Sequence, residues 1–489
     1  QRAKSLTEKR TFPPMNKTAT SLATLVSVFF FWGFVAASNG ILIPVFKAKL
    51  NLEQWQSQMI AFAFYVAYTV GSLGYLGLSK LAGTDLIGRW GYARALSYGL
   101  IISALGTLLF IPAAESASFP LLLSGLIVVG LGFSLQQTVA NPLAIALGTP
   151  ETGSMRLSLA GGVNNVGTTV GPLLVSYAIF GNAASSAGTA LDITAVKIPY
   201  LALGALFILF ALVFWNMDLG RPHAESAAES ASEEGRRSAF SYPQVWMGMI
   251  AIFLYVGVEV ATADNLPEYL KQYHGVTLDG IAPYISLYWA SLMIGRWTSS
   301  SGALGLAGLQ RQLARWALPA LAFGLFFLVN HLGGHDPARF VPYLGAVALL
   351  VLVDWATNGN PAKQLLIYSA LGAGALCVGM LADGPLAVYA FLSVGLFCSS
   401  LWPCIFTLSI AGMGSKTSQA SNALIMMIMG GGVVSLAQGA LAHEDYLGIR
   451  YSFLLGVLCF GYLAFYAWKV GNELRRRGVS LDGSAAGGH

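Results

Sequence analysis

Long apolar runs recur along the whole chain, and they constrain its fold more than any other feature. A membrane-spanning helix needs about 20 mostly apolar residues, and the 489-residue sequence contains fourteen such runs, six before a polar stretch and eight after it. Only 10% of the residues are charged, against about 25% in soluble proteins. The sequence therefore predicts an all-α polytopic membrane protein with about 14 transmembrane helices. The predicted spans are 21–46, 58–79, 95–113, 119–148, 156–181, 198–217, 243–272, 279–305, 314–332, 339–356, 365–382, 385–413, 419–443 and 449–472.

The polar stretch, residues 218–242, is rich in Ala, Ser and Glu. It predicts a flexible or loosely helical cytoplasmic linker between an N-terminal six-helix bundle at 21–217 and a C-terminal bundle at 243–472. If the N-terminus is cytoplasmic, 21 of the 27 Lys and Arg residues fall inside and 6 outside, as the positive-inside rule requires. We therefore expect both termini to be cytoplasmic. The first run is too long for a signal peptide, so we expect it to remain as a membrane helix.

The two halves also share a short motif. "LIGRWGYAR" at 86–94 and "MIGRWTSSS" at 293–301 each follow the second helix of their half. A repeated helical unit is typical of one large transporter architecture, although basic residues that simply end helices at the cytoplasmic face would look the same.

The four cysteines lie in apolar runs without metal-binding spacing, so we expect free thiols.

Polar residues inside the apolar runs are candidates for function, because burying an unpaired polar group costs several kcal/mol. They are mostly amides and carboxylates, and aromatic residues lie near them in sequence. This combination is typical of sugar binding, since sugar rings stack on aromatic faces and hydroxyls pair with planar polar groups. The alternatives are interhelical contacts for the amides and packing for the tryptophans. The polar residues are Asn39, Gln136, Gln137, Thr138, Asn141, Asn164, Asn165, Glu259, Asp264 and Asn265, and the aromatic residues are Trp32, Tyr255, Tyr288, Trp289 and Trp402.

The two acids are five residues apart, which is about 140° around a helix and about 7.5 Å along it. Glu259 and Asp264 therefore do not share a face, and we expect separate roles. Desolvation favours the neutral form of a buried carboxylic acid, which can then exchange a proton near neutral pH; a carboxylate can also ligate a cation together with backbone carbonyls. We expect a helix break near Pro267 that places Asp264 in a watery outer position, with Glu259 deeper.

Several long blocks resemble, in order and along nearly the whole chain, the fucose–galactose–glucose:proton symporter family of the major facilitator superfamily. The blocks are "FFFWGFVAASNGILIP", "QQTVANPLAIALGTPETGSMRLSLAGGVNNVGTTVGP", "AIFLYVGVEV", "YWASLMIGR", "SSLWPCIFTLSIAGMG" and "LIMMIMGGGVVSLAQGALA". The resemblance implies two six-helix bundles around a central cavity, alternating access and a hexose substrate. It also implies a bacterial-type inner membrane and no cofactor beyond co-transported H⁺ or Na⁺. By matched position, the sugar-site candidates are Asn39, Gln137, Asn141 and Asn164, with Trp289 and Trp402 as weaker ones and Glu259 from the other half.

The sequence departs from the family pattern at three positions. Gly40 stands where proton-coupled members have Asp, Gln137 where the fucose symporter has Glu, and Gly161 where a Gln is common. Neither Gly40 nor Gln137 can carry a proton. Glu259 or Asp264 would then bind the coupling cation, and Asp264 would be the metal ligand if the cation is sodium.

The family plan has twelve helices, so the spans at 314–332 and 339–356 resemble an added hairpin, residues 314–356. We expect it to lie peripherally and to face lipid, with Asp354 near its inner end. An even number of inserted helices preserves the orientation of the helices that follow.

These observations predict a secondary active transporter that imports a neutral hexose of the glucose, galactose or fucose type by cation symport. The alternatives are sodium rather than proton coupling, an uncoupled facilitator and, with less support, a lipid or drug exporter. An enzyme is not expected, because the longest internal polar stretch has a single His, His223, and no Walker A or GxSxG pattern. The expected partners are a hexose and membrane lipid, without nucleic acid, and we expect a monomer.

Overall fold

The structure is a computed structural model, and all of its regular structure is helical in the described residues. The described residues are 21–35, 54–116, 118–149, 152–180, 197–220, 238–276, 278–304, 306 and 308–479. The helices of the first half are an initial helix Ser21–Val35, α2 (Gln54–Ala82), α3 (Leu86–Trp90), α4 (Tyr92–Glu115), α5 (Phe119–Ala146), α6 (Gly153–Phe180) and α7 (Lys197–Trp215).

The second half begins after residue 238 and contains both long helices and short 3₁₀ turns. The long helices are α10 (Pro243–His274), α11 (Leu278–Ser299), α12 (Gly308–Leu332), α13 (Leu344–Thr357), α14 (Pro361–Leu381), α15 (Gly384–Cys398), α16 (Leu401–Ile410), α17 (Thr417–Met426), α18 (Gly430–Leu441) and α20 (Leu454–Arg476). The short elements are η3 (Ala239–Ser241), η4 (Ser300–Leu304), η5 (Ala338–Tyr343), η6 (Gly414–Lys416), η7 (Met427–Met429) and α19 (Gly448–Ser452).

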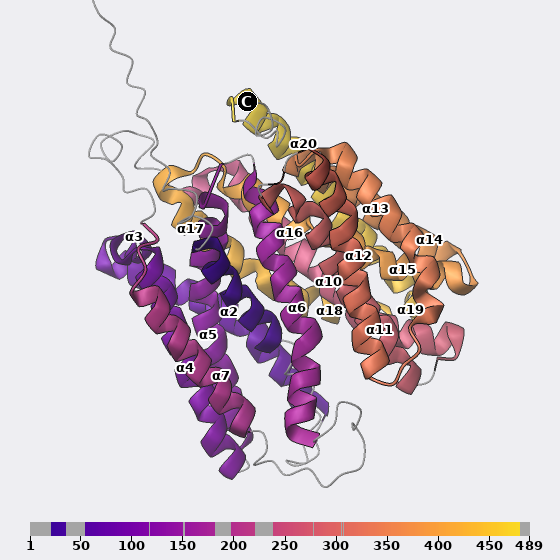
Figure 1. The fold of residues 1–489 in the computed structure, drawn as a ribbon, viewed down its shortest axis with the longest axis horizontal. Helices are drawn as coiled ribbons and strands as arrows, with labels where there is room; N and C mark the ends of the chain where they lie inside the picture. The colour runs from indigo at the N-terminus through magenta and orange to yellow at the C-terminus, as the bar shows by residue number, and fades with distance from the viewer. Residues whose placement is uncertain are drawn as a thin grey trace, which may run out of the picture.

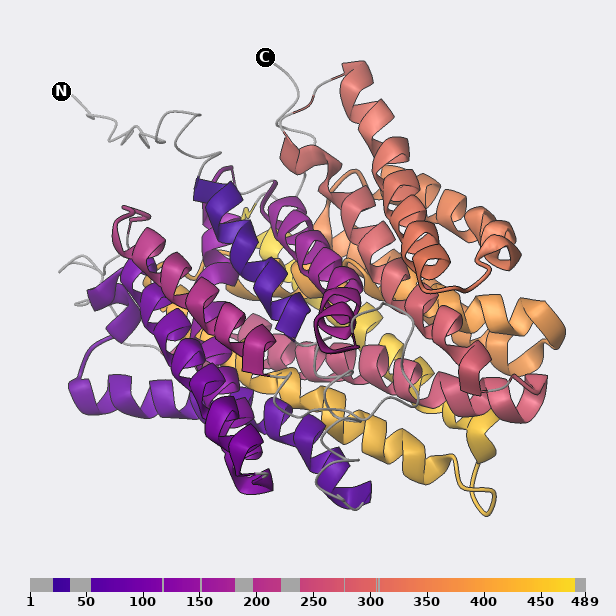
Figure 2. The ribbon, with the colours of Figure 1, turned by 60° about the horizontal axis from the view of Figure 1, so that its bottom comes forward.

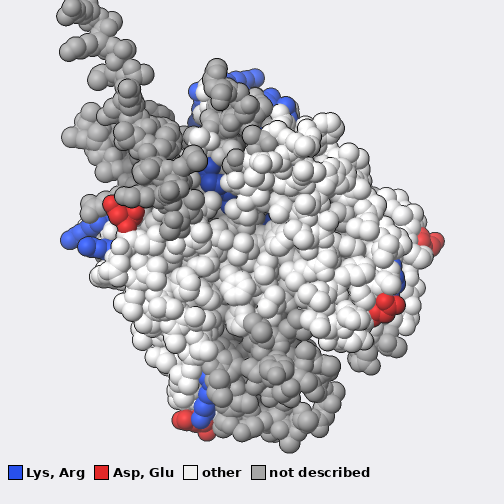
Figure 3. Space-filling model, in the orientation of Figure 1, with Lys and Arg blue, Asp and Glu red and all other residues white. Residues whose placement is uncertain are grey.

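Ten helical segments of the described residues are long and apolar enough to cross a membrane. On the face drawn in Figure 3, charged residues lie along the rim of the molecule and the broad middle carries almost none. This distribution is what a hydrocarbon environment requires. The prediction of an all-helical polytopic membrane protein is therefore confirmed. Most of the predicted linker and the end of the first predicted span lie outside the described residues.

The helices of each half pack mainly on one another. In the first half α4 packs against α5 and α7, and in the second half α14 packs against α15 and α20. Figure 1 shows α4, α5 and α7 on one side and α13, α14 and α15 on the other, with α6 and α10 between them. The halves meet where α6 packs on α11 and where α17 packs on α2 and α5.

Glycines let the initial helix approach α6 very closely. A Cβ atom at Gly33 would clash with the backbone oxygen of Asn164, and one at Gly167 would clash with the backbone oxygen of Phe30. Each helix therefore contributes one glycine to the same contact. This is the small-residue packing expected where lipid offers no hydrophobic drive for helix association, and it fixes the position of Asn164.

The predicted hairpin is present as two apolar segments of spanning length, α12 and the continuous stretch η5–α13 at Ala338–Thr357. Figure 2 shows the pair, coloured salmon to orange, at the edge of the molecule, away from α4 and α5. The pair is anchored by Asp354, which is buried. Its Oδ1 atom accepts hydrogen bonds from Ser299 Oγ at 2.8 Å and Gln364 Nε2 at 3.0 Å. The sequence placed Asp354 at the inner end of the hairpin but did not identify these partners.

The predicted single span 385–413 consists of two helices, α15 and α16, separated by Ser399 and Ser400. Pro403 has no backbone N–H, so it cannot donate the helical hydrogen bond that would close on the carbonyl of Ser399. That carbonyl accepts a hydrogen bond from the Arg296 guanidinium instead, with Nε 3.0 Å from the oxygen. The break therefore creates an acceptor for a side chain of another helix.

The predicted helix break near Pro267 is wrong. Helix α10 continues through Pro267 and ends at His274. The next residue, Gly275, has a φ of 60°, the left-handed conformation common just after helix C-termini. Leu266 and Leu270 on either side of the proline are fully buried. Packing on both sides holds the helix together where the proline removes a single hydrogen bond, which membrane helices tolerate.

Candidate functional site

Glu259 lies on α10 and is the centre of the candidate site. Its carboxylate accepts a hydrogen bond from the Tyr255 hydroxyl one turn earlier on the same helix. The Tyr288 hydroxyl of α11 donates to the backbone oxygen of Glu259 at 2.8 Å. Tyr255 and Tyr288 are fully buried. The acid is therefore held in place by two aromatic residues from two helices.

One chain of polar contacts connects Glu259 to α6 of the other half. The Tyr255 oxygen accepts from Arg296 Nη2 at 3.4 Å, while Arg296 Nη1 donates to Asn165 Oδ1 at 2.8 Å. Asn165 is only 4% exposed. Arg296 thus lies between a carboxylate of the second half and an amide of the first half.

Polar groups of α5 and α2 lie on the side of the first half that meets the second. Gln137 Nε2 of α5 donates to the Tyr68 hydroxyl of α2 at 2.9 Å. One turn earlier on α2, the Tyr65 ring lies against α18 and α10, because a Cβ atom at Gly431 would be 2.9 Å from Tyr65 Cε1 and 3.1 Å from Val256 Cγ1. Gln137, a predicted sugar-site residue, therefore pairs with a tyrosine one turn away from a contact between the halves.

The other predicted amides have less direct relations to Glu259. Asn141 is buried and donates to the backbone oxygen of Gln137, one turn earlier, at 2.9 Å. Asn164 Nδ2 donates to the backbone oxygen of Phe29 in the initial helix, also at 2.9 Å. Asn39 lies outside the described residues, so the structure does not place it.

The two predicted tryptophans are both half-buried. The ring of Trp402 lies 6.2 Å from that of Tyr255, centroid to centroid. The ring of Trp289 lies 5.6 Å from that of Tyr288. Each tryptophan therefore neighbours one of the two tyrosines that hold Glu259, within the range of aromatic contacts.

Asp264 has different surroundings from Glu259. It is exposed, and its Oδ2 atom accepts from Ser435 Oγ of α18 at 2.5 Å. The spacing of the two acids predicted separate faces, and the structure gives them separate hydrogen-bond partners. The described residues contain no group of three or more His, Cys, Asp or Glu that could hold a metal ion.

The sequence did not single out three residues of this region as site candidates: Tyr65, Tyr68 and Arg296. Arg296 occurs in the "MIGRW" motif, which suggested a cytoplasmic helix end. Only its place in an otherwise apolar run could have marked it as partly buried. The two tyrosines had no distinguishing sequence signal, because aromatic residues are common in membrane helices.

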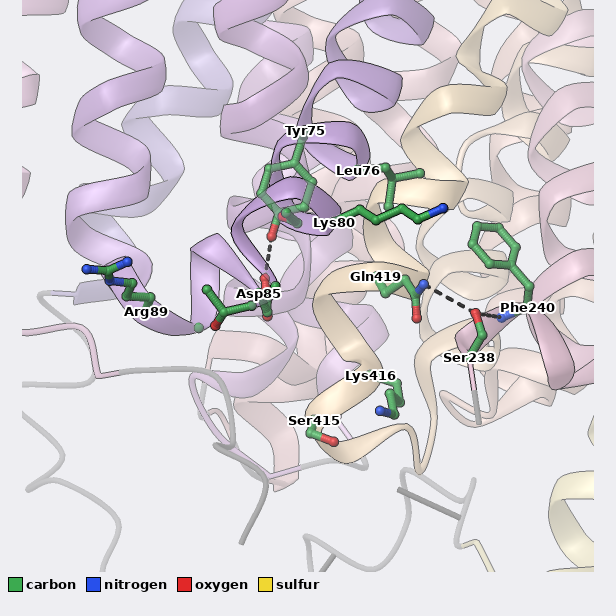
Figure 4. A pocket seen from close by; sticks show the side chains of 14 residues that line it. Tyr75, Leu76, Lys80, Asp85, Arg89, Ser238, Phe240, Ser415, Lys416 and Gln419 are labelled. Atoms are coloured by element: carbon green, nitrogen blue, oxygen red, sulfur yellow. Dashed lines mark hydrogen bonds between the residues drawn. The ribbon is translucent and has the colours of Figure 1, made fainter. Parts of the chain in front are cut away.

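A pocket of about 880 Å³ lies between α2 and α3 of the first half and η3, η6 and α17 of the second. Figure 4 shows Tyr75 hydrogen-bonded to Asp85 on one side, and Gln419 facing Ser238 on the other. Lys80 extends toward Phe240, while Arg89 points away. No predicted sugar-site residue lines this pocket. The pocket therefore lies where the end of α2 in the first half meets the start of α17 and the end of the linker in the second.

Comparison with known proteins gives one family match and several full-length relatives. The sequence model of the Major Facilitator Superfamily matches residues 20–338. A glucose/galactose transporter of Brucella abortus is 33% identical, with 91% of this chain and 93% of the relative covered. The L-fucose-proton symporter of Escherichia coli is 27% identical, with 91% and 92% covered. The crystal structure of the E. coli fucose:proton symporter has a TM-score of 0.69 at 22% identity, covering 93% of this chain and 99% of that one, so the two share a fold.

Proposed function

Because the chain belongs to the Major Facilitator Superfamily and to its fucose–galactose–glucose symporter group, we propose that it imports a neutral hexose by cation symport. Family membership confirms the predicted resemblance. It also confirms an integral membrane transporter rather than an enzyme. The names of the relatives, which include glucose/galactose transporters and an L-fucose-proton symporter, support a hexose as the substrate.

The observation that carries the proposal is the position of Glu259. It is a carboxylate in an apolar helix, and hydrogen bonds through Tyr255 and Arg296 connect it to α6 of the other half. A site between two bundles is where such transporters bind their substrate. Amides, tyrosine hydroxyls and a carboxylate offer both donors and acceptors to sugar hydroxyls.

In the proposed mechanism the sugar hydroxyls pair with Gln137, Asn141 and Asn164, and with Asn39. Trp402 and Trp289 face the sugar ring, and Glu259 binds the coupling cation. Sodium needs several oxygen ligands, whereas the groups bonded around Glu259 include a hydroxyl that donates to the carboxylate and a guanidinium that can only donate. A proton needs only one carboxylate oxygen, and this difference favours proton coupling. In the sodium alternative Asp264 is the ligand.

In the proposed arrangement two six-helix bundles, 21–217 and 243–472, are joined by a cytoplasmic linker at 218–242. The hairpin α12–α13 adds two spans, which gives fourteen in a bacterial-type inner membrane, with cytoplasmic termini and a monomeric protein. The bonds between the halves support a closed cytoplasmic end. Asn422 donates to the backbone oxygen of Ser72 at 2.9 Å, and Thr138 donates to Asn422 at 3.3 Å. These residues lie in the parts of α2, α5 and α17 that belong to the inner half of the membrane in this topology.

Uptake into proteoliposomes tests the proposal. Labelled glucose, galactose, mannose and fucose are supplied with an imposed proton gradient, a sodium gradient or none. Saturable uptake of one sugar, accumulated only with a proton gradient, is expected. Absence of saturable uptake of any sugar would contradict a hexose substrate and leave an exporter as the alternative. Equal uptake without a gradient would indicate a facilitator.

Two single variants then assign the coupling acid. Glu259→Gln should abolish gradient-driven accumulation, while Asp264→Asn should retain it, because Asp264 is exposed and accepts a hydrogen bond from the Ser435 hydroxyl of α18, which an asparagine can also accept. The reverse result would move coupling to Asp264. Retained accumulation in both variants would show that neither acid couples.

A further inference from the structure

Arg296 joins the two halves with all three nitrogens of its guanidinium. Within its own half, Nε donates to the Ser399 backbone oxygen at 3.0 Å and Nη2 to the Tyr255 hydroxyl at 3.4 Å. Across the interface, Nη1 donates to the Gly161 backbone oxygen at 3.2 Å and to Asn165 Oδ1 at 2.8 Å. A planar guanidinium can satisfy such a set of directed acceptors, whereas a lysine ammonium cannot.

Both halves provide acceptors or space for the Arg296 side chain. In its own half, Pro403 leaves the Ser399 carbonyl without a helical donor. In the other half, a Cβ atom at Gly161 would lie 3.2 Å from Arg296 Cδ, and one at Gly162 would clash with the Trp297 ring. The two glycines of α6 therefore leave the space that Arg296 and Trp297 occupy, and any larger side chain would separate the halves.

The same guanidinium is sensitive to the charge of Glu259 through Tyr255. An ionised carboxylate can only accept hydrogen bonds, so the Tyr255 hydroxyl donates to it and presents its oxygen to Arg296. A neutral carboxylic acid can itself donate, so the Tyr255 hydroxyl no longer has to direct its proton at Glu259. The neutral acid also no longer attracts the positive charge of the Arg296 guanidinium. Among the described residues, the other titratable side chains near Glu259 are Tyr65, Tyr288 and Cys398, and none of the three carries a positive charge.

We propose that Arg296 is a positioning residue that latches the cytoplasmic ends of the two halves together while Glu259 is charged, and releases them when Glu259 is neutralised. The proposal rests on the proposed function in two respects: the topology that makes these ends cytoplasmic, and the coupling cation as the neutralising species. With Glu259 charged the latch is held, and the site cannot open to the cytoplasm. With Glu259 neutral the bonds to Gly161 and Asn165 lose their support, and the halves separate. The latch thereby prevents the charged, cation-free carrier from opening inward.

Distances between spin labels at the cytoplasmic ends test the latch directly. Thr84, after α2, and Arg475, near the end of α20, are exposed and are replaced by labelled cysteines in the full chain in nanodiscs, with Cys377→Ala to remove the half-buried native thiol. Without sugar, Arg296→Gln should raise the ratio of long to short distances roughly tenfold, as typical coupling free energies allow. Glu259→Gln should shift the ratio in the same direction, and the double variant should shift it no further.

Three further variants separate the latch from a general loss of stability. Asn165→Ala removes one of the two acceptors that the other half offers to Arg296 and keeps the charge, so it should also lengthen the distances. Tyr255→Phe should make them insensitive to Glu259→Gln. Arg156→Gln is the matched control, because this buried arginine bonds backbone oxygens of α5 and its following loop, and it should leave the distances unchanged.

Unchanged distances in both Arg296→Gln and Asn165→Ala would overturn the latch. Independent, additive shifts from Arg296→Gln and Glu259→Gln would overturn its dependence on the charge of Glu259. These measurements need no sugar, so they remain decisive if the protein transports no hexose. If it does, Arg296→Gln should additionally allow sugar to equilibrate without a gradient, which a purely structural arginine would not cause.

Discussion

Gln136 and Gln137 are neighbours in the chain with different surroundings. Gln136 is fully buried, accepts from Trp32 Nε1 at 2.9 Å and donates to Ser103 Oγ at 2.9 Å. Gln137 is half-buried and points toward the tyrosines of α2. The first amide therefore holds helices together, and the second is available to a substrate.

This difference gives a paired prediction. Gln137→Ala should raise the KM for the transported sugar about fivefold, the equivalent of one neutral hydrogen bond of about 1 kcal/mol, with little change in melting temperature. Gln136→Ala should lower the melting temperature and leave KM unchanged, because it leaves buried partners unsatisfied. Uptake kinetics and thermal unfolding of both variants provide the measurement. An unchanged KM in Gln137→Ala would remove it from the sugar site.

At the scale of elements, two prolines in apolar runs have opposite consequences. Pro403 follows a break between two helices, and Pro267 lies within an unbroken one. The difference depends on neighbours distant in sequence, since Arg296 satisfies the carbonyl left free near Pro403. Propensity alone cannot distinguish the two cases, and the sequence therefore gave the wrong prediction for Pro267.

The contact between the initial helix and α6 can be tested with glycine substitutions. Gly167→Ala should destabilise the protein by about 1–3 kcal/mol, because the new methyl group clashes with the Phe30 backbone and overpacking has that cost. Gly374→Ala in α14 is the control. No atom lies within 4 Å of its added Cβ, and alanine favours a helix over glycine by about 0.5–1 kcal/mol.

Melting temperatures in detergent report both substitutions. The value should fall for Gly167→Ala and should hold or rise for Gly374→Ala. Equal melting temperatures for the two variants would mean that the initial helix can move away from α6 at no cost.

At the scale of the whole molecule, the proposed fourteen-span topology predicts which loops face outward. Asp336 lies in the loop between α12 and α13 and is exposed, as is Thr84 in the loop after α2. A membrane-impermeant maleimide should label Asp336→Cys on intact cells, but Thr84→Cys only after permeabilisation. The unsubstituted chain is the control, because three of its four cysteines are buried and the fourth is half-buried. Protection of Asp336→Cys on intact cells would show that the hairpin does not cross the membrane.

The sequence by itself determined the class of fold and the membership of the family. Hydropathy and charge are local properties, so runs of about 20 apolar residues define spanning helices whatever their neighbours are. Gln137 and Glu259 could be recognised as polar residues within membrane spans because this, too, depends only on the sequence around them. The two apolar runs that contain α12 and α13 were also visible from their length.

Only the tertiary structure decided which of these polar groups meet. Arg296 and Asn165 are 131 residues apart in the chain, and Gln137 and Tyr68 are 69 apart. Their pairing depends on how helices pack, on a carbonyl freed by Pro403 and on the space left by Gly161. The energy of a buried polar group depends on its partner, and a pattern along one helix carries no information about a partner on another.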